Sequence, residues 1–137
     1  MSQAYSRRVR PPIPTLTVQL RSSITDQSTG PLTALVDTGA DATIAPLHHP
    51  LEIGAEESTP DWLQGVTGER QPVALYFVDI RIEPVINPGV RVIASKAVED
   101  ILLGRDALNR LALFLDGPQQ QTDVLDDATA NRLRARR

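Results

Sequence analysis

The chain has 137 residues, of which 41% are hydrophobic and 23% are charged, and it contains no cysteine. That length suits one domain with a real core and is too short for two. The missing thiols exclude disulfides, thiolate metal sites and cysteine nucleophiles, and no apolar run approaches the roughly 18 residues of a membrane helix. Because residues 1–10 also lack the apolar stretch of a secretory signal, we expect a cytoplasmic protein without membrane contact.

Charge is distributed unevenly along the chain. All 17 acidic residues lie between Asp26 and Asp127, whereas seven of the 14 basic residues lie at the two ends. Residues 11–131 therefore carry 7 basic and 17 acidic residues, a net charge of −10. Basic ends contact nucleic acid in some proteins. Here no aromatic side chains are interleaved with the arginines, so we interpret the ends as solvated tails and expect no nucleic-acid partner.

The first half of the chain predicts short strands. Residues 15–20 alternate polar and apolar side chains, which is typical of a half-buried strand. A turn cluster at 26–30 then predicts a hairpin with residues 32–36. We expect a third strand at 42–45. Residues 46–57 are predicted to be irregular with one helical turn, and His48-His49 within them are interpreted as surface residues because no further metal ligand lies at a useful spacing.

The second half predicts more strands and two helices. Residues 62–64 and 69–71 are expected to form a hairpin. A long strand is expected at 73–82, which either bends or pairs with two partners, and shorter strands are expected at 90–94, 101–103 and 111–115. Asn87-Pro88-Gly89 predicts a turn. Helices are expected at 105–111 and, after a polar linker at 119–121, at 123–137. This tally predicts a small all-β barrel or sandwich-like domain.

One stretch carries a chemical signal. The apolar residues Ala34-Leu35-Val36 lead into Asp37-Thr38-Gly39, followed by Ala40-Asp41. A carboxylate at the end of a strand that should be buried is costly unless it is hydrogen-bonded, paired or catalytic. Two further segments follow in order: a glycine-tipped hairpin at Gly65-Val66-Thr67-Gly68, and the apolar run Ile101-Leu102-Leu103 that ends in Gly104-Arg105.

In this order and spacing the three segments, spanning about residues 13–117, resemble the retropepsins, the single-domain aspartic proteases of retroviruses and related proteins. The resemblance implies an all-β fold: a small closed β-barrel with one short helix near the C-terminal end of the domain. We expect this domain at residues 13–117, after a basic Pro-rich tail at 1–12 and before a linker and an additional charged C-terminal helix at 118–137.

The resemblance also implies an aspartic endopeptidase without cofactor or metal that cleaves an extended peptide or protein substrate. Two carboxylates that lie close together share a proton, so one activates water while the other donates to the carbonyl oxygen. The chain holds only one apolar-apolar-Asp-Thr-Gly, because Asp116-Gly117 lacks the threonine. The second carboxylate must then be Asp37 of another copy, and we expect a homodimer.

The resemblance assigns supporting roles to the neighbouring residues. The Thr38 hydroxyl would bond across the dimer axis, and Gly39 would let the substrate backbone approach closely. Asp41 and Arg105 are expected to form a pair that fastens the helix beneath the active-site turn. Gly65, Val66, Thr67 and Gly68 would form the tip of a flap that covers the substrate.

An alternative stays open at this stage. The family usually closes its dimer with apolar strands from both chain ends, whereas here the N-terminus is Pro-rich and the segment after Pro118 is polar. The chain could therefore be a catalytically silent module that binds an extended peptide by strand addition or mediates dimerisation. The intact Asp-Thr-Gly favours the enzyme, since a module that uses only the groove has no need of this carboxylate.

Ala40 predicts a specific pH behaviour. Many aspartic proteases have Ser or Thr at this place, whose hydroxyl bonds the catalytic carboxylate and favours its ionised form. Because alanine cannot do so, we expect Ala40→Ser to move the pH–activity profile toward acid. A profile measured on one peptide for both proteins tests this, and an unchanged or alkaline-shifted optimum would contradict it.

Overall fold

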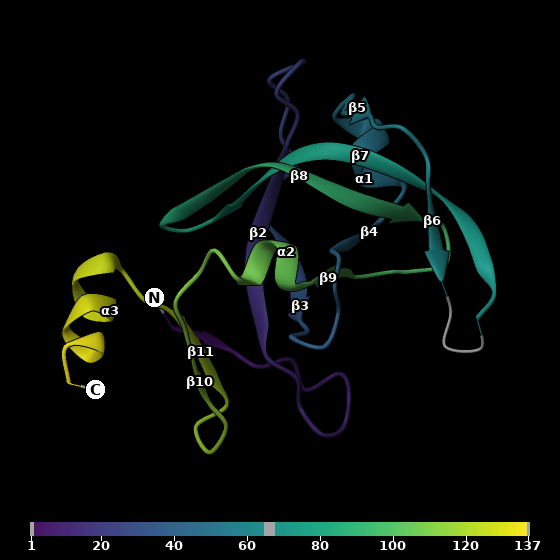
Figure 1. Cartoon of the computed structure of the whole chain (residues 1–137). Coiled ribbons are helices and arrows are strands. Elements are labelled where there is room, and N and C mark those ends of the chain that lie inside the picture. Colours follow the sequence, from purple (N-terminus) through teal and green to yellow (C-terminus); the bar gives the residue numbers. More distant parts are fainter. Residues whose placement is uncertain (1, 65–67, 137) are drawn as a thin grey trace.

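The computed structural model of the chain describes residues 2–64 and 68–136, and this part consists mainly of strands (Figure 1). The strands are β1 (Ser2–Ala4), β2 (Thr15–Arg21), β3 (Leu32–Val36), β4 (Ile44–Pro46), β5 (Glu56–Glu57), β6 (Asp61–Gln64), β7 (Arg70–Ile82), β8 (Val85–Ser95), β9 (Ile101–Leu103), β10 (Leu113–Asp116) and β11 (Gln121–Val124). The helices are α1 (His48–Glu52), α2 (Arg105–Leu108) and α3 (Asp127–Arg134).

A ring of strands closes the main sheet into a barrel. The order β2-β3-β9-β4-β8-β7 returns to β2 through an additional β2–β7 pairing, which gives six strands in the closed barrel. The β3–β9 and β4–β8 pairs are parallel, and the other pairs of the ring are antiparallel. The expected all-β closed barrel is therefore confirmed.

Alternating side chains explain why these strands enclose a core. In β2 the apolar Leu16, Val18 and Leu20 point inward and are fully buried. Ala34 and Val36 of β3 also point inward and are buried, while Thr33 and Leu35 face outward. An alternation of this kind specifies the strand register, because a slip of one residue would expose every apolar side chain.

Strand β7 is long because it serves several partners, as the sequence indicated. It pairs with β6 through its first residues, with β8 through the rest, and with β5 and β2 along its other edge. The predicted turn at Asn87-Pro88-Gly89 was wrong, because these residues lie inside β8. The register shifts between Val78 and Ile80, and the Gly89 N–H donates to Asp79 Oδ1 at 2.9 Å, so the glycine at φ 62° belongs to a bulge.

The chain ends form a second sheet with the order β1-β11-β10, next to α3 (Figure 1). The linker and helix predicted for 119–137 were partly wrong, because β11 occupies Gln121–Val124 and the helix begins only at Asp127. The strand escaped notice because its sequence is polar, although Thr122 and Val124 point inward and are buried. The predicted helix at 105–111 is shorter, since α2 ends at Leu108.

The longest helix of the described chain, α3, has eight residues. Within residues 2–64 and 68–136, no helix combines the length and apolar character that a membrane crossing requires.

Gly104, between β9 and α2, predicts a large effect on stability. A Cβ added there would lie 2.5 Å from the backbone carbonyl carbon and oxygen of Ala42, and a backbone cannot rotate away as a side chain can. We expect Gly104→Ala to lower the free energy of unfolding by about 1–3 kcal/mol, measured by chemical denaturation. Gly30→Ala is the matched control, because nothing lies within 4 Å of its added Cβ. Equal effects of the two substitutions would contradict the prediction.

Candidate active site

Asp37 directly follows β3, and the backbone around it fixes its position. Its N–H donates to the carbonyl oxygen of Leu103 at 3.1 Å, which attaches it to the neighbouring strand β9. Its own carbonyl oxygen accepts from the Ala40 N–H at 3.2 Å, which closes a tight turn. The side chain is half-buried, so the carboxylate is held in place and still reaches solvent.

The turn also orients the carboxylate itself. Oδ1 of Asp37 accepts a hydrogen bond of 2.9 Å from the Gly39 N–H. Among the described residues no hydrogen bond reaches Oδ2, so this oxygen is available to water or to another acid. A Cβ at Gly39 would lie 3.2 Å from Oδ1, which is a tight contact. Glycine therefore allows the turn to approach its own carboxylate.

Helix α2 lies beneath this turn and bonds to it repeatedly. The Arg105 N–H donates to the Ala40 carbonyl oxygen at 2.8 Å, and the Arg105 guanidinium donates to the Thr38 carbonyl oxygen at 2.8 Å. The same guanidinium forms an ion pair with Asp41, as the sequence led us to expect. The Asp41 side chain is 89% exposed and that of Arg105 43%, so water screens this pair and it contributes about 0–1 kcal/mol.

A second connection between the turn and α2 was not predicted from the sequence. Asp106 accepts hydrogen bonds from the Thr43 N–H at 3.1 Å and from the Thr43 hydroxyl at 2.7 Å. That hydroxyl in turn accepts from the Gly104 N–H at 3.1 Å, and Thr43 is fully buried. The sequence signal was an acidic residue in the first turn of the helix, which is too common to identify a partner 63 positions away.

The β6–β7 hairpin lies near the same region. Its arms pair from Asp61↔Val73 to Gln64↔Arg70, as the sequence predicted. Asp61, Trp62 and Val73 line a cavity of about 230 Å³ together with Ala42, the residue after Asp41. Of the predicted flap tip, Gly65, Val66 and Thr67 lie outside the described residues, whereas Gly68 is described and has φ 89°.

Comparison with known proteins agrees with this geometry. Residues 10–116 match the retroviral aspartyl protease family. The chain belongs to that family. Among curated protein sequences, none matches it significantly.

Two solved structures share the fold of this member of the family. EIAV protease in complex with the inhibitor HBY-793 is 22% identical, with a TM-score of 0.55 over 77% of this chain and 92% of the other. A retropepsin-like aspartic protease from Rickettsia conorii is 15% identical, with a TM-score of 0.59 over 90% of this chain and 88% of the other. At these identities the two structures support the fold alone.

His48 and His49 have a neighbour that the sequence analysis overlooked. His48 Nδ1 lies 3.3 Å from Glu52 Oε1, and ligand atoms of the three residues all lie within 4.8 Å of one another. Glu52 is therefore a third potential ligand beside the two histidines, contrary to the expectation from the sequence. Burial lowers the pKa of His49, and the adjacent His48 adds to this effect. Among the bonds described around Asp37, none involves this cluster.

The two connections of α2 predict different losses of stability. Asp106→Ala would leave the buried Thr43 N–H and hydroxyl without their acceptor, so we expect a loss of about 1–3 kcal/mol in unfolding free energy. Arg105→Ala removes an exposed ion pair and an exposed hydrogen bond to the Thr38 carbonyl oxygen, which water can replace, so we expect a loss below about 1 kcal/mol. Asp106→Asn keeps one acceptor and should fall between them. Denaturation of the three variants checks this order, and a larger loss for Arg105→Ala would contradict it.

Proposed function

We propose that the protein is an aspartic endopeptidase that acts as a homodimer, with Asp37 of each subunit forming the catalytic pair. The observation that carries this proposal is the position of Asp37 in its turn. One carboxylate oxygen is oriented by the Gly39 N–H, and the other is free of hydrogen bonds from the described residues. Membership of the retroviral aspartyl protease family supports the same chemistry.

Two such carboxylates side by side would perform the reaction. Because like charges at close range cannot both ionise, the pair holds one shared proton, and its titration belongs to the pair. The ionised partner accepts a proton from water, which attacks the peptide carbonyl carbon. The protonated partner donates to the carbonyl oxygen and stabilises the developing charge. The intermediate then collapses: the first carboxyl gives the proton it took from water to the leaving nitrogen, the C–N bond breaks, and the second carboxylate takes a proton back from a hydroxyl of the intermediate.

The second carboxylate comes from a second copy of the chain. Asp116-Gly117 is the nearest equivalent of Asp37-Thr38-Gly39 elsewhere in the chain, and it lies at the end of β10. Asp116 Oδ1 accepts a hydrogen bond from the Gln119 N–H at 3.1 Å. That bond gives Asp116 a local role in its turn. A two-fold axis through the dimer would place the same Asp37 twice about one site.

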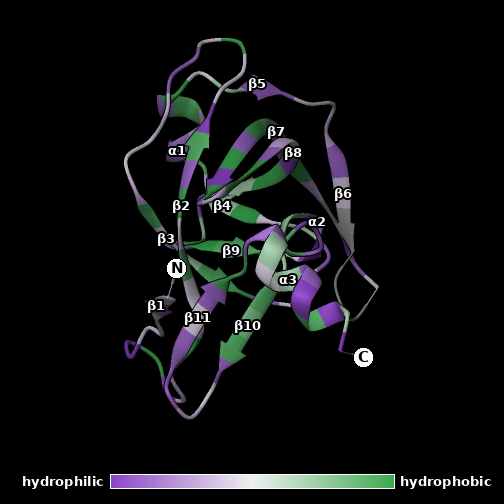
Figure 2. Cartoon of the chain, turned by 90° about the vertical axis from the view of Figure 1, so that its left-hand side faces the viewer, coloured by the Kyte–Doolittle hydropathy of each residue, from purple (hydrophilic) through white to green (hydrophobic). Residues whose placement is uncertain are grey.

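The terminal sheet offers a surface through which two copies of the chain could pair. In the order β1-β11-β10, the outer edge of β10 has no strand partner within the described chain. Phe114 and Leu115 on this strand are 50% and 43% exposed, and Figure 2 shows β10 as a hydrophobic strand beside the mostly hydrophilic β11. An unpaired edge with apolar side chains is a template for pairing with another chain. We therefore place the subunit contact at β10.

The β6–β7 hairpin is the proposed flap. Its arms share a cavity with Ala42, next to the Asp37–Asp41 turn, so the hairpin starts on the side of the molecule where substrate would lie. A lid there would exclude water and bond the substrate backbone through its tip, residues 65–68. Thr38, Gly39 and Ala40 would complete the floor of the site below it.

Asp37→Asn tests the enzyme. Because asparagine cannot accept the proton of the attacking water, we expect cleavage of an unstructured peptide library to fall by about 100-fold or more. Asp26→Asn is the matched control, since Asp26 lies in an exposed loop at φ 63°, a conformation that asparagine tolerates. We expect this control to cleave like the wild type.

Sedimentation of the same samples tests the dimer. The wild type and both variants should sediment at twice the mass of one chain. A confirmed dimer that cleaves no peptide would favour the silent binding module, and a strictly monomeric protein that still cleaves would overturn the shared pair of carboxylates.

A further inference from the structure

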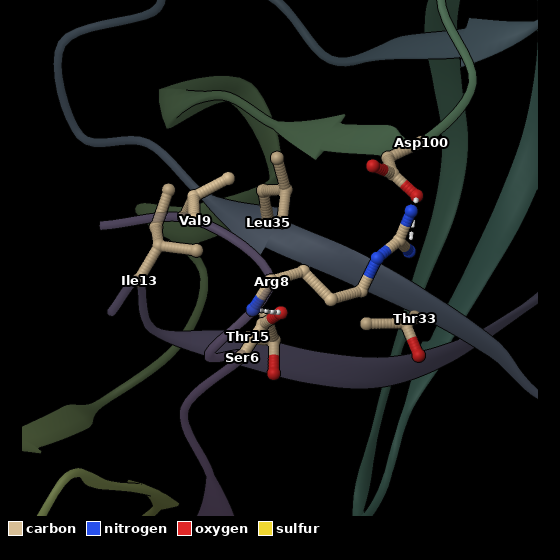
Figure 3. A pocket seen from close by; sticks show the side chains of 8 residues that line it. All are labelled: Ser6, Arg8, Val9, Ile13, Thr15, Thr33, Leu35 and Asp100. Atoms are coloured by element: carbon tan, nitrogen blue, oxygen red, sulfur yellow. Dashed lines mark hydrogen bonds and ion pairs between the residues drawn. The ribbon is translucent and has the colours of Figure 1, made fainter. Parts of the chain in front are cut away.

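A cavity of about 360 Å³ lies between the N-terminal segment and the outward face of β3 (Figure 3). Its two ends differ in chemistry. Figure 3 shows the apolar Val9, Ile13 and Leu35 gathered at one end and the charged Arg8 and Asp100 meeting at the other. The proposed function leaves this cavity without a role.

The strand alternation of β3 connects the cavity to Asp37. Ala34 and Val36 point into the core, so Thr33, Leu35 and Asp37 share the opposite face. Thr33 and Leu35 both line the cavity. Two residues along a strand span about 7 Å, which is also the distance between alternate side chains of an extended peptide. The cavity therefore begins one side-chain step from the proposed catalytic carboxylate.

Strand β9 brings Asp100 to the same face. Its parallel register with β3 pairs Ala34 with Ile101, so Asp100 lies next to Thr33. Ile101 and Leu103 are buried in the core, and by alternation Asp100 and Leu102 face outward. Asp100 thus forms the far end of the cavity, and Leu35 lies between it and Asp37.

The Asp100 carboxylate has few interactions with the rest of the protein. Among the described residues, its single ionic contact is Arg8 Nη1 at 3.7 Å, and it accepts no hydrogen bond. The Arg8 side chain is 75% exposed and that of Asp100 39%. A pair this open and this long contributes about 0–1 kcal/mol, so a substrate cation can readily replace Arg8.

We propose that this cavity receives a long basic side chain, lysine or arginine, of the substrate residue next to the scissile bond. The aliphatic stem packs along Val9 and Leu35, and the cationic end binds Asp100 in place of Arg8. The net charge of −10 over residues 11–131 also attracts basic peptides. This inference rests on the proposed function, and in a homodimer the two copies of the cavity would lie on either side of the cleaved bond.

Peptides that differ at one residue test the proposal. The residue before the cleaved bond is lysine in one peptide and norleucine, which keeps the apolar stem without the charge, in the other. We expect the wild type to cleave the lysine peptide with the higher kcat/KM. Asp100→Asn should lower the lysine-to-norleucine ratio about two- to fivefold, the size of one exposed ion pair. Arg8→Gln should raise the ratio, because it removes the competing cation.

These opposite shifts distinguish recognition from damage to the fold, since a misfolded variant would lower cleavage of both peptides alike. If the wild type cleaves the peptides and Asp100→Asn leaves the ratio unchanged, the inference is overturned and the proposed function stands.

Binding to the Asp37→Asn protein separates the inference from the reaction. Fluorescence anisotropy with the same two labelled peptides should show tighter binding of the lysine peptide and loss of that preference in Asp37→Asn/Asp100→Asn. If the wild type cleaves nothing but this preference is seen, the protease proposal fails and the pocket is supported. If the two peptides bind equally to Asp37→Asn, the inference is overturned.

Discussion

The buried contact between Thr43 and Asp106 is the interaction on which the geometry of the site depends. It connects the chain just after the Asp37 turn to the first turn of α2, and Thr43 also accepts from the Gly104 N–H. Because Thr43 is inaccessible to water, loss of Asp106 would leave the Thr43 N–H and hydroxyl proton without an acceptor. Loss of the Thr43 hydroxyl would likewise leave the Gly104 N–H without a partner. The close approach of Gly104 to the backbone of Ala42 belongs to the same contact, since a side chain there would force α2 away.

The exposed pair of Arg105 and Asp41 complements this contact in a different way. Its Coulomb energy is small at the surface, but the Arg105 guanidinium also donates to the Thr38 carbonyl oxygen, and the Arg105 backbone N–H donates to that of Ala40. Both carbonyl groups belong to the turn, so the two bonds restrict its orientation relative to α2. Asp106 contributes mainly to stability, whereas Arg105 contributes mainly to the orientation of the residues around Asp37.

Much of the barrel could be predicted because its strands carry local signals. The alternation in β2, the apolar run before Asp37 and the run of β9 each reflect burial of one or both faces, which any strand of a closed barrel requires. The Arg105–Asp41 pair could be predicted because both residues lie within segments of recognisable order, and the same order made Asp37 a candidate. The signals failed where a distant partner decides the structure: polar β11 is a strand because β1 and β10 flank it, and Gly89 belongs to a bulge because Asp79 accepts its N–H.

The contacts of Asp106 and Asp100 could not be predicted from the sequence for the same reason. Each is an acidic residue in an ordinary place, and its partner lies far away in the chain: Thr43 for Asp106 and Arg8 for Asp100. Their positions become informative only once the pairing of β9 with β3 is known. Because β9 runs parallel to β3, its inward residues extend the core beside Ala34 and Val36, and its outward residues extend the face that carries Asp37. One strand pairing thus fixes both the packing of the barrel and the side chains beside the carboxylate, so a register shift between β3 and β9 would disturb the core and the face that carries Asp37 together.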